Sequence, residues 1–428
     1  MFAPRTTSWP LVALFTAGYL APYLLPTIVG RLDAGLPLTA TQAGAVGSTL
    51  LLASAAAGFL LASRTERIGA RAAARAGLAL VALGYGGAAL AHAVPAVVAG
   101  ALAGGFGSGT VTAVAAAGIA AQRDPHRASA LGLLSVSAVA GAVYLAVPHL
   151  GPGHGQPLAA LALAALAVWP STGRLPVGRS TAPARREARP RLPHRRLGLA
   201  LAAALPCWSL AQNALWGVSG RIGLYQAHLS EAAVGAVFAV ALGAGLLGVL
   251  GAGALGTRWG RAVPIGAGTA LIAGCVALSA SAAGLPAFAT GQIAWNVLYP
   301  VVLSYLIGLA SCLDPRGRWA VLTGSASSLG TAAGPLAGSA LAAQAGFPAM
   351  GALLAAGLLV VALPLTAVAL HGPGRVAVPR TAGASRSRLL GPHRRGNVSA
   401  AVAGSTGSPV VEIPVETPAP RDYDTAAA

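Results

Sequence analysis

The sequence predicts an all-α polytopic membrane protein, with twelve transmembrane helices arranged as two six-helix halves. Of its 428 residues, 55% are hydrophobic and only 9% are charged, whereas a soluble domain carries about 25% charged residues. The apolar residues recur in long blocks, and a bilayer crossing takes roughly 20 of them. Arginines alternate between the gaps that separate the blocks, and the two halves of the chain share a residue pattern.

Twelve apolar blocks follow one another along the chain, and each is expected to form one span. They fall at residues 9–30, 42–63, 72–92, 94–121, 128–149, 156–170, 198–220, 232–256, 262–283, 285–310, 319–343 and 348–371. The first block exceeds the core of a signal peptide, so we expect it to be retained. The predicted organisation is an N-terminal segment 1–8, a bundle 9–170, an Arg/Pro-rich linker 171–197, a bundle 198–371 and a disordered tail 372–428.

All 28 basic residues are arginines, and the formal net charge is +18. They do not cluster on a soluble domain, so nucleic-acid binding is not expected. They occupy every second gap between the blocks, and the opposite gaps hold only Arg31 and Arg221. The positive-inside rule then places both termini in the cytoplasm. Arginine without lysine, with abundant alanine and glycine, is typical of a GC-rich bacterial gene, so we expect a multi-pass protein of the bacterial cytoplasmic membrane.

The two halves match at an offset of 190 or 191 residues, which indicates a duplicated six-span unit. The matching segments are Gly30-Arg31-Leu32 with Gly220-Arg221-Ile222, Leu38-Thr39 and Gly44 with Leu229-Ser230 and Gly235, Arg67-Ile68-Gly69 with Arg258-Trp259-Gly260, and Asp124-Pro125 with Asp314-Pro315. Each Asp-Pro pair is expected to start a helix, with Asp as the N-cap and Pro in the first turn. Alternatively, each aspartate pairs with a neighbouring arginine.

These features resemble the major facilitator superfamily of secondary transporters. That family carries a pattern close to G-x-L-A-D-R-x-G-R-R between spans 2 and 3, and the chain has Glu66-Arg67-Ile68-Gly69-Ala70-Arg71 there. The partner loop, Gly253 to Arg261, has Thr257 at the acidic position. The resemblance implies two bundles that rock about a central cavity. It also implies a cytoplasmic gate formed by Glu66, Arg67, Gly69, Arg71, Arg258, Gly260 and Arg261. Alternatively, Glu66 and its arginines only flank helix ends.

The sequence does not predict an enzyme, a metal site or a cofactor. It has no H-E-x-x-H motif and no paired aspartates, and its three cysteines show no metal-ligand spacing. None of the ten carboxylates falls in the middle of a predicted span, which places proton coupling in doubt because such groups are the usual proton carriers. The segment Gly330 to Gly338 (GTAAGPLAG) is expected to form a flexible or closely packed helix crossing.

Polar and aromatic side chains share one face on three predicted spans. In the family that the chain resembles, spans 1, 4, 7 and 10 line the cavity, so these faces are candidate substrate contacts. The candidates are Tyr19 and Tyr23 on span 1, Gln212, Asn213 and Trp216 on span 7, and Gln292, Asn296 and Tyr299 on span 10. Hydrogen bonding between helices is the alternative role for the same amides.

The predicted function is transport of a small neutral or amphipathic organic solute, with export favoured. The alternatives are an uptake permease or facilitator for an organic anion, and a receptor or scaffold with a transporter fold. Arg31 and Arg221 are expected at the outer mouth, where they either extend to the lipid headgroups or attract an anionic substrate. The expected partners are the substrate and membrane lipid, and a monomer is expected.

Overall fold

The computed structural model describes residues 8–61, 68–122, 124–175, 192–256, 258–314 and 317–372. Within these ranges the chain forms twelve α-helices, three short helical turns and no strand. The first half contains α1 (Trp9–Tyr23), α2 (Leu25–Gly35), α3 (Ala40–Leu61), α5 (Ala70–Leu90), α6 (Val94–Ala120), α7 (Pro125–Ala146), η1 (Val147–His149), α8 (Gly155–Val168) and η2 (Trp169–Arg174). The second contains α9 (Arg195–Arg221), η3 (Ile222–Gln226), α10 (Glu231–Leu255), α11 (Ala262–Ala280), α12 (Leu285–Leu313) and α13 (Arg318–His371).

The helices correspond to the predicted apolar blocks, with two irregularities. The first block is bent by 49° between α1 and α2, next to Pro22 and Pro26, whose rings disrupt helical hydrogen bonding. The last two blocks form α13, which is interrupted at Gly346, where φ is 78°. Nine described helices are long and apolar enough to cross a membrane, or ten if the bent pair counts as one span. The chain is therefore an all-α polytopic membrane protein, as the sequence predicted.

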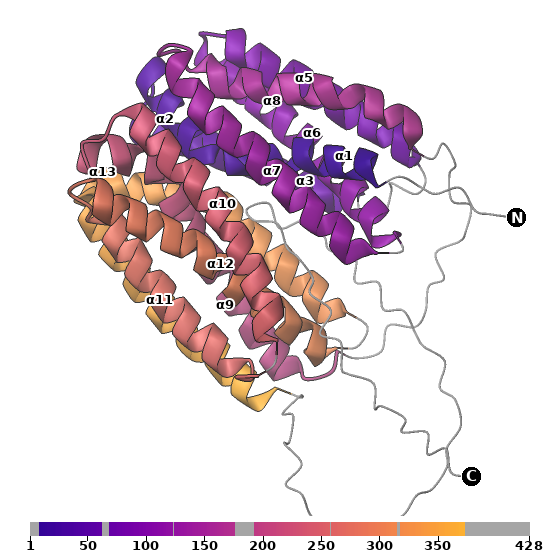
Figure 1. Cartoon of the computed structure of the whole chain (residues 1–428), viewed down its shortest axis with the longest axis vertical. Coiled ribbons are helices and arrows are strands. Elements are labelled where there is room, and N and C mark those ends of the chain that lie inside the picture. The colour runs from indigo at the N-terminus through magenta and orange to yellow at the C-terminus, as the bar shows by residue number, and fades with distance from the viewer. Residues whose placement is uncertain are drawn as a thin grey trace, which may run out of the picture.

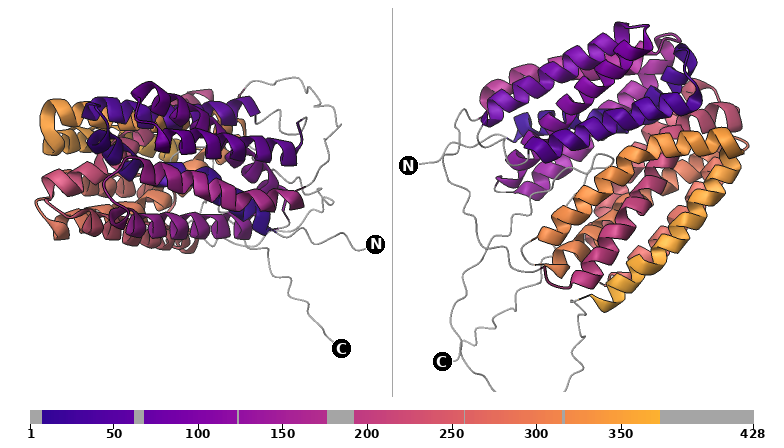
Figure 2. Two further views of the ribbon diagram at one scale, coloured as in Figure 1. Left: turned by 90° about the horizontal axis from the view of Figure 1, so that it is seen from above. Right: turned by 180° about the vertical axis from the view of Figure 1, so that it is seen from behind.

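The helices form two bundles, one from α1 to α8 and one from α9 to α13 (Figures 1 and 2). The bundles meet at one end and diverge toward the end at which α1 begins and α13 ends (Figure 1). We call the first the distal end, where His154 packs on Gly35 and contacts the Ala91 carbonyl. The other is the proximal end, where Trp319 donates to the Pro193 carbonyl over 2.7 Å.

The two bundles contact each other mainly through α2 with α9, α3 with α13, and α7 with α10. Two glycines that the repeat matches, Gly44 and Gly235, lie in these contacts. A Cβ on Gly44 would lie 2.6 Å from the Pro335 carbonyl oxygen, and one on Gly235 would overlap the Tyr144 carbonyl oxygen. Small residues let helix backbones approach closely in membranes. The repeated glycines thus explain how the halves pack at this interface.

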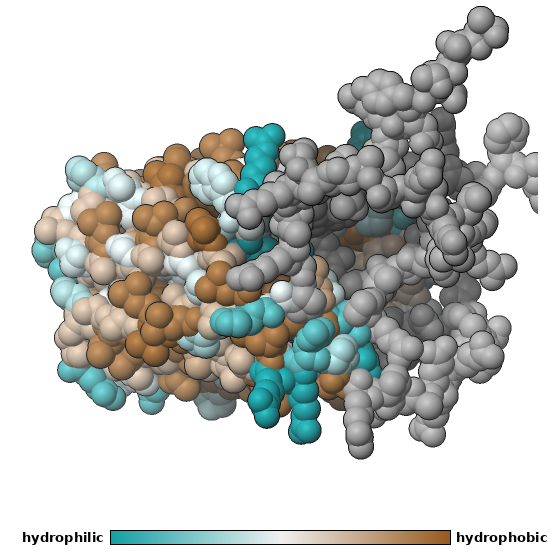
Figure 3. Space-filling model, turned by 90° about the horizontal axis from the view of Figure 1, so that it is seen from below, coloured by the Kyte–Doolittle hydropathy of each residue, from teal (hydrophilic) through white to brown (hydrophobic). Residues whose placement is uncertain are grey.

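Large apolar side chains cover the outside of the bundles. Leu83, Leu90, Leu250 and Leu363 are each at least 70% exposed, as expected of side chains that face lipid rather than water. Figure 3 shows mainly hydrophobic residues over the middle of one face and hydrophilic residues near the end from which the grey segments leave.

The two Asp-Pro pairs have different places in the fold. Asp124 is the N-cap of α7 and accepts a hydrogen bond from the Arg127 backbone over 3.0 Å, which confirms the first predicted helix start. The second predicted helix start, at Asp314, is wrong, because Asp314 lies at the C-cap of α12 and α13 begins after Gly317. Asp314 is 2% exposed, and its carboxylate lies 2.6 Å from Nε of Arg318. Asp314 thus pairs with a neighbouring arginine, the alternative role expected from the sequence.

Candidate functional site

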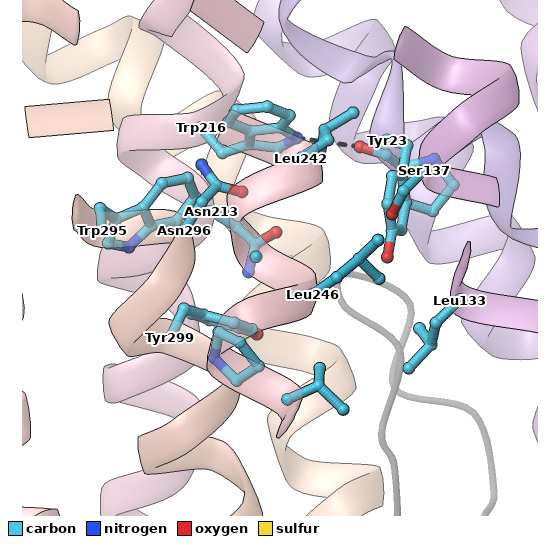
Figure 4. A pocket seen from close by; sticks show the side chains of 14 residues that line it. Tyr23, Leu133, Ser137, Asn213, Trp216, Leu242, Leu246, Trp295, Asn296 and Tyr299 are labelled. Atoms are coloured by element: carbon cyan, nitrogen blue, oxygen red, sulfur yellow. Dashed lines mark hydrogen bonds between the residues drawn. The ribbon is translucent and has the colours of Figure 1, made fainter. Parts of the chain in front are cut away.

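A cavity with about 660 Å³ of empty space lies between the two bundles (Figure 4). The first half lines it with Pro22 and Tyr23 of α1 and with Leu133 and Ser137 of α7. The second half contributes Asn213 and Trp216 of α9, apolar side chains of α10 that include Leu242 and Leu246, and Trp295, Asn296 and Tyr299 of α12. No charged side chain lines this central cavity among the described residues.

Two amides on the second-half wall are fixed by hydrogen bonds to their own helices. Nδ2 of Asn213 donates to the Ser209 carbonyl over 2.9 Å, and Nδ2 of Asn296 donates to the Gln292 carbonyl over 3.0 Å. A backbone carbonyl can only accept, so the nitrogen of each amide must be the atom that faces it. Each Oδ1 is thereby left as the atom that can accept from a ligand. In Figure 4 both amides lie on the wall opposite Tyr23 and Ser137.

Aromatic rings make up much of the same wall. The Trp216 and Trp295 rings lie 5.5 Å apart, and Trp295 lies 5.9 Å from Tyr299. The Trp216 indole also donates to the Pro22 carbonyl of the other half over 3.0 Å. That carbonyl lacks its usual α-helical donor because Pro26, four residues later, has no N–H. The bend in the first span therefore creates a bond that joins the two halves beside the cavity.

A second polar group lies behind this wall, between α9 and α12. Gln212 and Gln292 are both 0% exposed. The Trp295 indole donates to Oε1 of Gln212, and Nε2 of Gln292 donates to the Ser219 hydroxyl over 3.0 Å. Nε2 of Gln212 and Oε1 of Gln292 have no partner among the described residues. This buried network joins the two helices, and neither of its glutamines lines the cavity, whereas Trp295 belongs to both.

The structure separates the predicted substrate contacts into two groups. Tyr23, Asn213, Trp216, Asn296 and Tyr299 line the central cavity. Tyr19, Gln212 and Gln292 do not; Tyr19 is 4% exposed and its ring lies 4.4 Å from that of Phe15.

The sequence did not point to Ser137, and it placed Trp295 on the polar face of span 10 without selecting it as a substrate contact. Trp295 lies three residues after Gln292, so the helical face that selected Gln292 already contained it. Ser137 had no such signal, because it is a small polar residue on α7, a helix from which no cavity contact was expected.

The residues predicted for the cytoplasmic gate are described only in part. Glu66 and Arg67 lie outside the described residues. Arg71 donates to the carbonyls of Gly173 (2.5 Å) and Leu175 (2.7 Å) within its own half. Gly69 and Gly260 are matched by the repeat and both have positive φ, 91° and 66°, which glycine adopts without strain. Arg258 is exposed and Arg261 is half-buried, both beside Gly260.

The two arginines predicted at the outer mouth lie at the distal end, and both are 4% exposed. Arg31 of the first half pairs with Glu231 of the second at 2.7 Å. Arg221 of the second half pairs with Asp33 of the first at 3.7 Å. Their burial in the protein contradicts extension to the lipid headgroups, one of the two roles considered from the sequence.

No family model and no curated protein matches the chain in sequence. Solved structures match it in fold. The human organic anion transporter MFSD10 (TETRAN) aligns with a TM-score of 0.62 and 19% identity, over 85% of this chain and 100% of that one. The POT family transporter PepTSo aligns with a TM-score of 0.66 and 12% identity, over 86% of this chain and 98% of that one. The nucleoside transporter NupG aligns with a TM-score of 0.64 and 14% identity, over 84% of this chain and 99% of that one. The chain therefore has the fold of these transporters.

Proposed function

We propose that this protein is a secondary transporter that exports a small neutral or amphipathic organic solute across the bacterial cytoplasmic membrane. The observation that carries the proposal is the central cavity, which the described residues of both halves line without a charged side chain. Ligand sites are typically concave and mostly apolar, with a few placed polar groups. Two amide oxygens and four aromatic side chains fit a planar or amphipathic molecule that carries hydrogen-bond donors. The fold shared with transporters of organic solutes supports the same function.

The mechanism that we propose is alternating access by rocking of the two halves. Packed interfaces have discrete arrangements, so two bundles joined by a limited interface can exchange between two states. In the present state the halves contact each other on the distal side of the cavity, through α2 with α9 and α3 with α13. We take the proximal end as cytoplasmic from the arginine distribution, and the active unit as a monomer in contact with lipid. Neither a cofactor nor nucleic acid enters this mechanism.

The test starts with ligand discovery on the purified protein. Neutral, cationic and anionic organic compounds are screened for an increase in unfolding temperature, and the stabilising compounds are tested for counterflow in reconstituted vesicles. We expect neutral or amphipathic compounds to stabilise the protein and to exchange across the vesicle membrane. Compounds that bind without exchanging would contradict transport and favour a receptor or scaffold. In cells, export lowers accumulation of the same compound, and a rise in accumulation would contradict the proposed direction.

The second candidate is an uptake permease or facilitator for an organic anion. One observation favours it: Nε of Arg221 is buried and has no hydrogen-bond partner among the described residues. An anion that enters the distal end could accept from this guanidinium. Arg221→Gln would then weaken transport of an anionic compound, and more strongly at low salt, because salt screens the attraction. Unchanged anion transport in this variant would rule the candidate out.

A further inference from the structure

A second cavity, with about 570 Å³ of empty space, lies between the halves at the distal end. Ala34 and Arg31 line it from α2, and Tyr225 and Glu231 line it from the second half. Ala34 and Tyr225 are exposed, so this distal cavity reaches the surface.

One aromatic layer separates the distal cavity from the central one. Tyr144 lines the distal cavity, and its hydroxyl donates to the Tyr23 carbonyl over 2.6 Å. Tyr23 and Trp216 line the central cavity on the other side. The Phe238 ring lies 5.0 Å from that of Tyr144 and 5.3 Å from that of Trp216. Both halves contribute to this layer, so it can open only when they separate at the distal end.

The Arg31–Glu231 pair joins the halves beside this layer. The Arg31 guanidinium donates to Glu231 over 2.7 Å and to the Gly151 carbonyl of its own half over 2.5 Å. Arg31 is therefore anchored at the end of the first bundle while it reaches the second. Glu231 lies in the first turn of α10, where the helix dipole stabilises a carboxylate. The Gly151 contact of Arg31 and the helix dipole beside Glu231 both stabilise this ion pair in the distally closed state.

The Arg221–Asp33 pair repeats this arrangement in the opposite direction. Arg221 lies 3.7 Å from Asp33 across the interface and donates to the Ser339 hydroxyl of its own half over 2.9 Å. The repeat matches Arg31 with Arg221. Each half thus provides one buried arginine, anchored in its own bundle, and one acid that receives the arginine of the other half.

We propose that the distal cavity is the outer vestibule of the transport path, and that these two crossed ion pairs hold the aromatic layer closed. The proposal rests on the proposed function, because a vestibule requires that solute pass between the halves. Removing an acid leaves a buried arginine unpaired in the closed state, which is unfavourable. The same arginine becomes hydrated when the halves part. Loss of either acid therefore shifts the population toward the distally open state.

The experiment measures access to the central cavity from each face of the membrane. In a background with Cys207, Cys275 and Cys312 replaced by serine, Ser137→Cys places one thiol in the central cavity. Membrane vesicles of both orientations are treated with a membrane-impermeant maleimide, and Ala34→Cys in separate vesicles identifies the face that carries the distal end. We expect Glu231→Gln to raise labelling of the Ser137→Cys thiol from the distal face at least threefold. Asp33→Asn should raise it less, because its ion pair is longer.

The acids are the positions to change because their side chains are 44% and 18% exposed, whereas both arginines are buried. Asp124→Asn is the matched control: it neutralises an acid at a helix N-terminus of the proximal end, and Asn also caps helices well. It should leave distal labelling unchanged, and equal labelling of Ala34→Cys in the parent and in Glu231→Gln checks the fold. Acid variants that label as slowly as the parent overturn the proposal. Failure of the proposed function appears separately, as loss of counterflow in the parent protein.

Discussion

Four amide side chains on α9 and α12 form two pairs: the two asparagines line the central cavity and the two glutamines do not. Asn296 lines the cavity, whereas Gln292 is buried and donates to Ser219. We expect Asn296→Ala to raise the ligand midpoint several-fold and to change which analogues bind, since a lost hydrogen bond costs about 0.5–1.5 kcal/mol. Gln292→Ala should instead lower stability by about 1–3 kcal/mol, because it leaves a buried network incomplete.

Ligand titrations and thermal unfolding of the two variants, with one stabilising compound and its analogues, check this prediction. Tyr23→Phe is the control: it removes a hydroxyl from the opposite wall, keeps the ring, and should change the midpoint less than Asn296→Ala. If Gln292→Ala changes analogue preference and Asn296→Ala does not, the assignment of the two amides is reversed.

The sequence could not separate these amides, for a geometric reason. Residues that follow each other on a helix differ by about 100° in direction, so Gln212 and Asn213 border the same predicted face. Gln212 accepts from Trp295 between the helices, and Asn213 lines the cavity. Only the position of α12 decides between these two roles. Hydrophobic periodicity locates a polar stripe but not the neighbour that each side chain contacts.

Three glycines of α13 determine how closely this helix packs on α9. Gly330, Gly334 and Gly338 follow a four-residue spacing, and a Cβ on each would meet α9, at Pro206, Asn213 and Ala214 respectively. Of the two roles expected for this segment, a flexible or a closely packed crossing, the structure shows close packing. The segment Gly330 to Gly338 therefore supports the binding site, because α13 packs against the α9 backbone that carries Asn213.

We expect Gly334→Ala to destabilise the protein and to weaken ligand binding. Its Cβ would lie 2.7 Å from the Asn213 carbonyl carbon and 2.9 Å from the Ala214 nitrogen, so the α9 backbone must shift. Overpacking of this kind costs about 1–3 kcal/mol. Gly357→Ala is the control on the same helix, since nothing lies within 4 Å of its added Cβ. Unfolding temperature and ligand midpoint are the measurements, and equal behaviour of the two variants would contradict the packing argument.

At the scale of the whole molecule, the repeat predicted the two-bundle fold but not which charges would pair across it. The offset identified Arg31 and Arg221 as equivalents. Their acidic partners could not be found in the same way, because Arg31 and Glu231 are 200 residues apart and meet only through the packing of the halves. Asp33 and Glu231 are also not equivalent in the repeat. The ion pairs are therefore a property of the interface, which local sequence patterns do not encode.

Rocking of two rigid halves predicts opposite distance changes at the two ends of the molecule. Spin labels on Ala34→Cys and Tyr225→Cys report on the distal end. At the proximal end, a label on His126→Cys reports on the start of α7, and a label on Ala254→Cys reports on the end of α10. All four positions are exposed. When Glu231→Gln is added, double electron–electron resonance should show a longer distal distance and a shorter proximal distance, in matching fractions of the molecules. The fractions match because one rigid-body motion changes both distances. A longer distal distance without proximal shortening would mean that the distal helices separate locally, and would contradict rocking of the two halves.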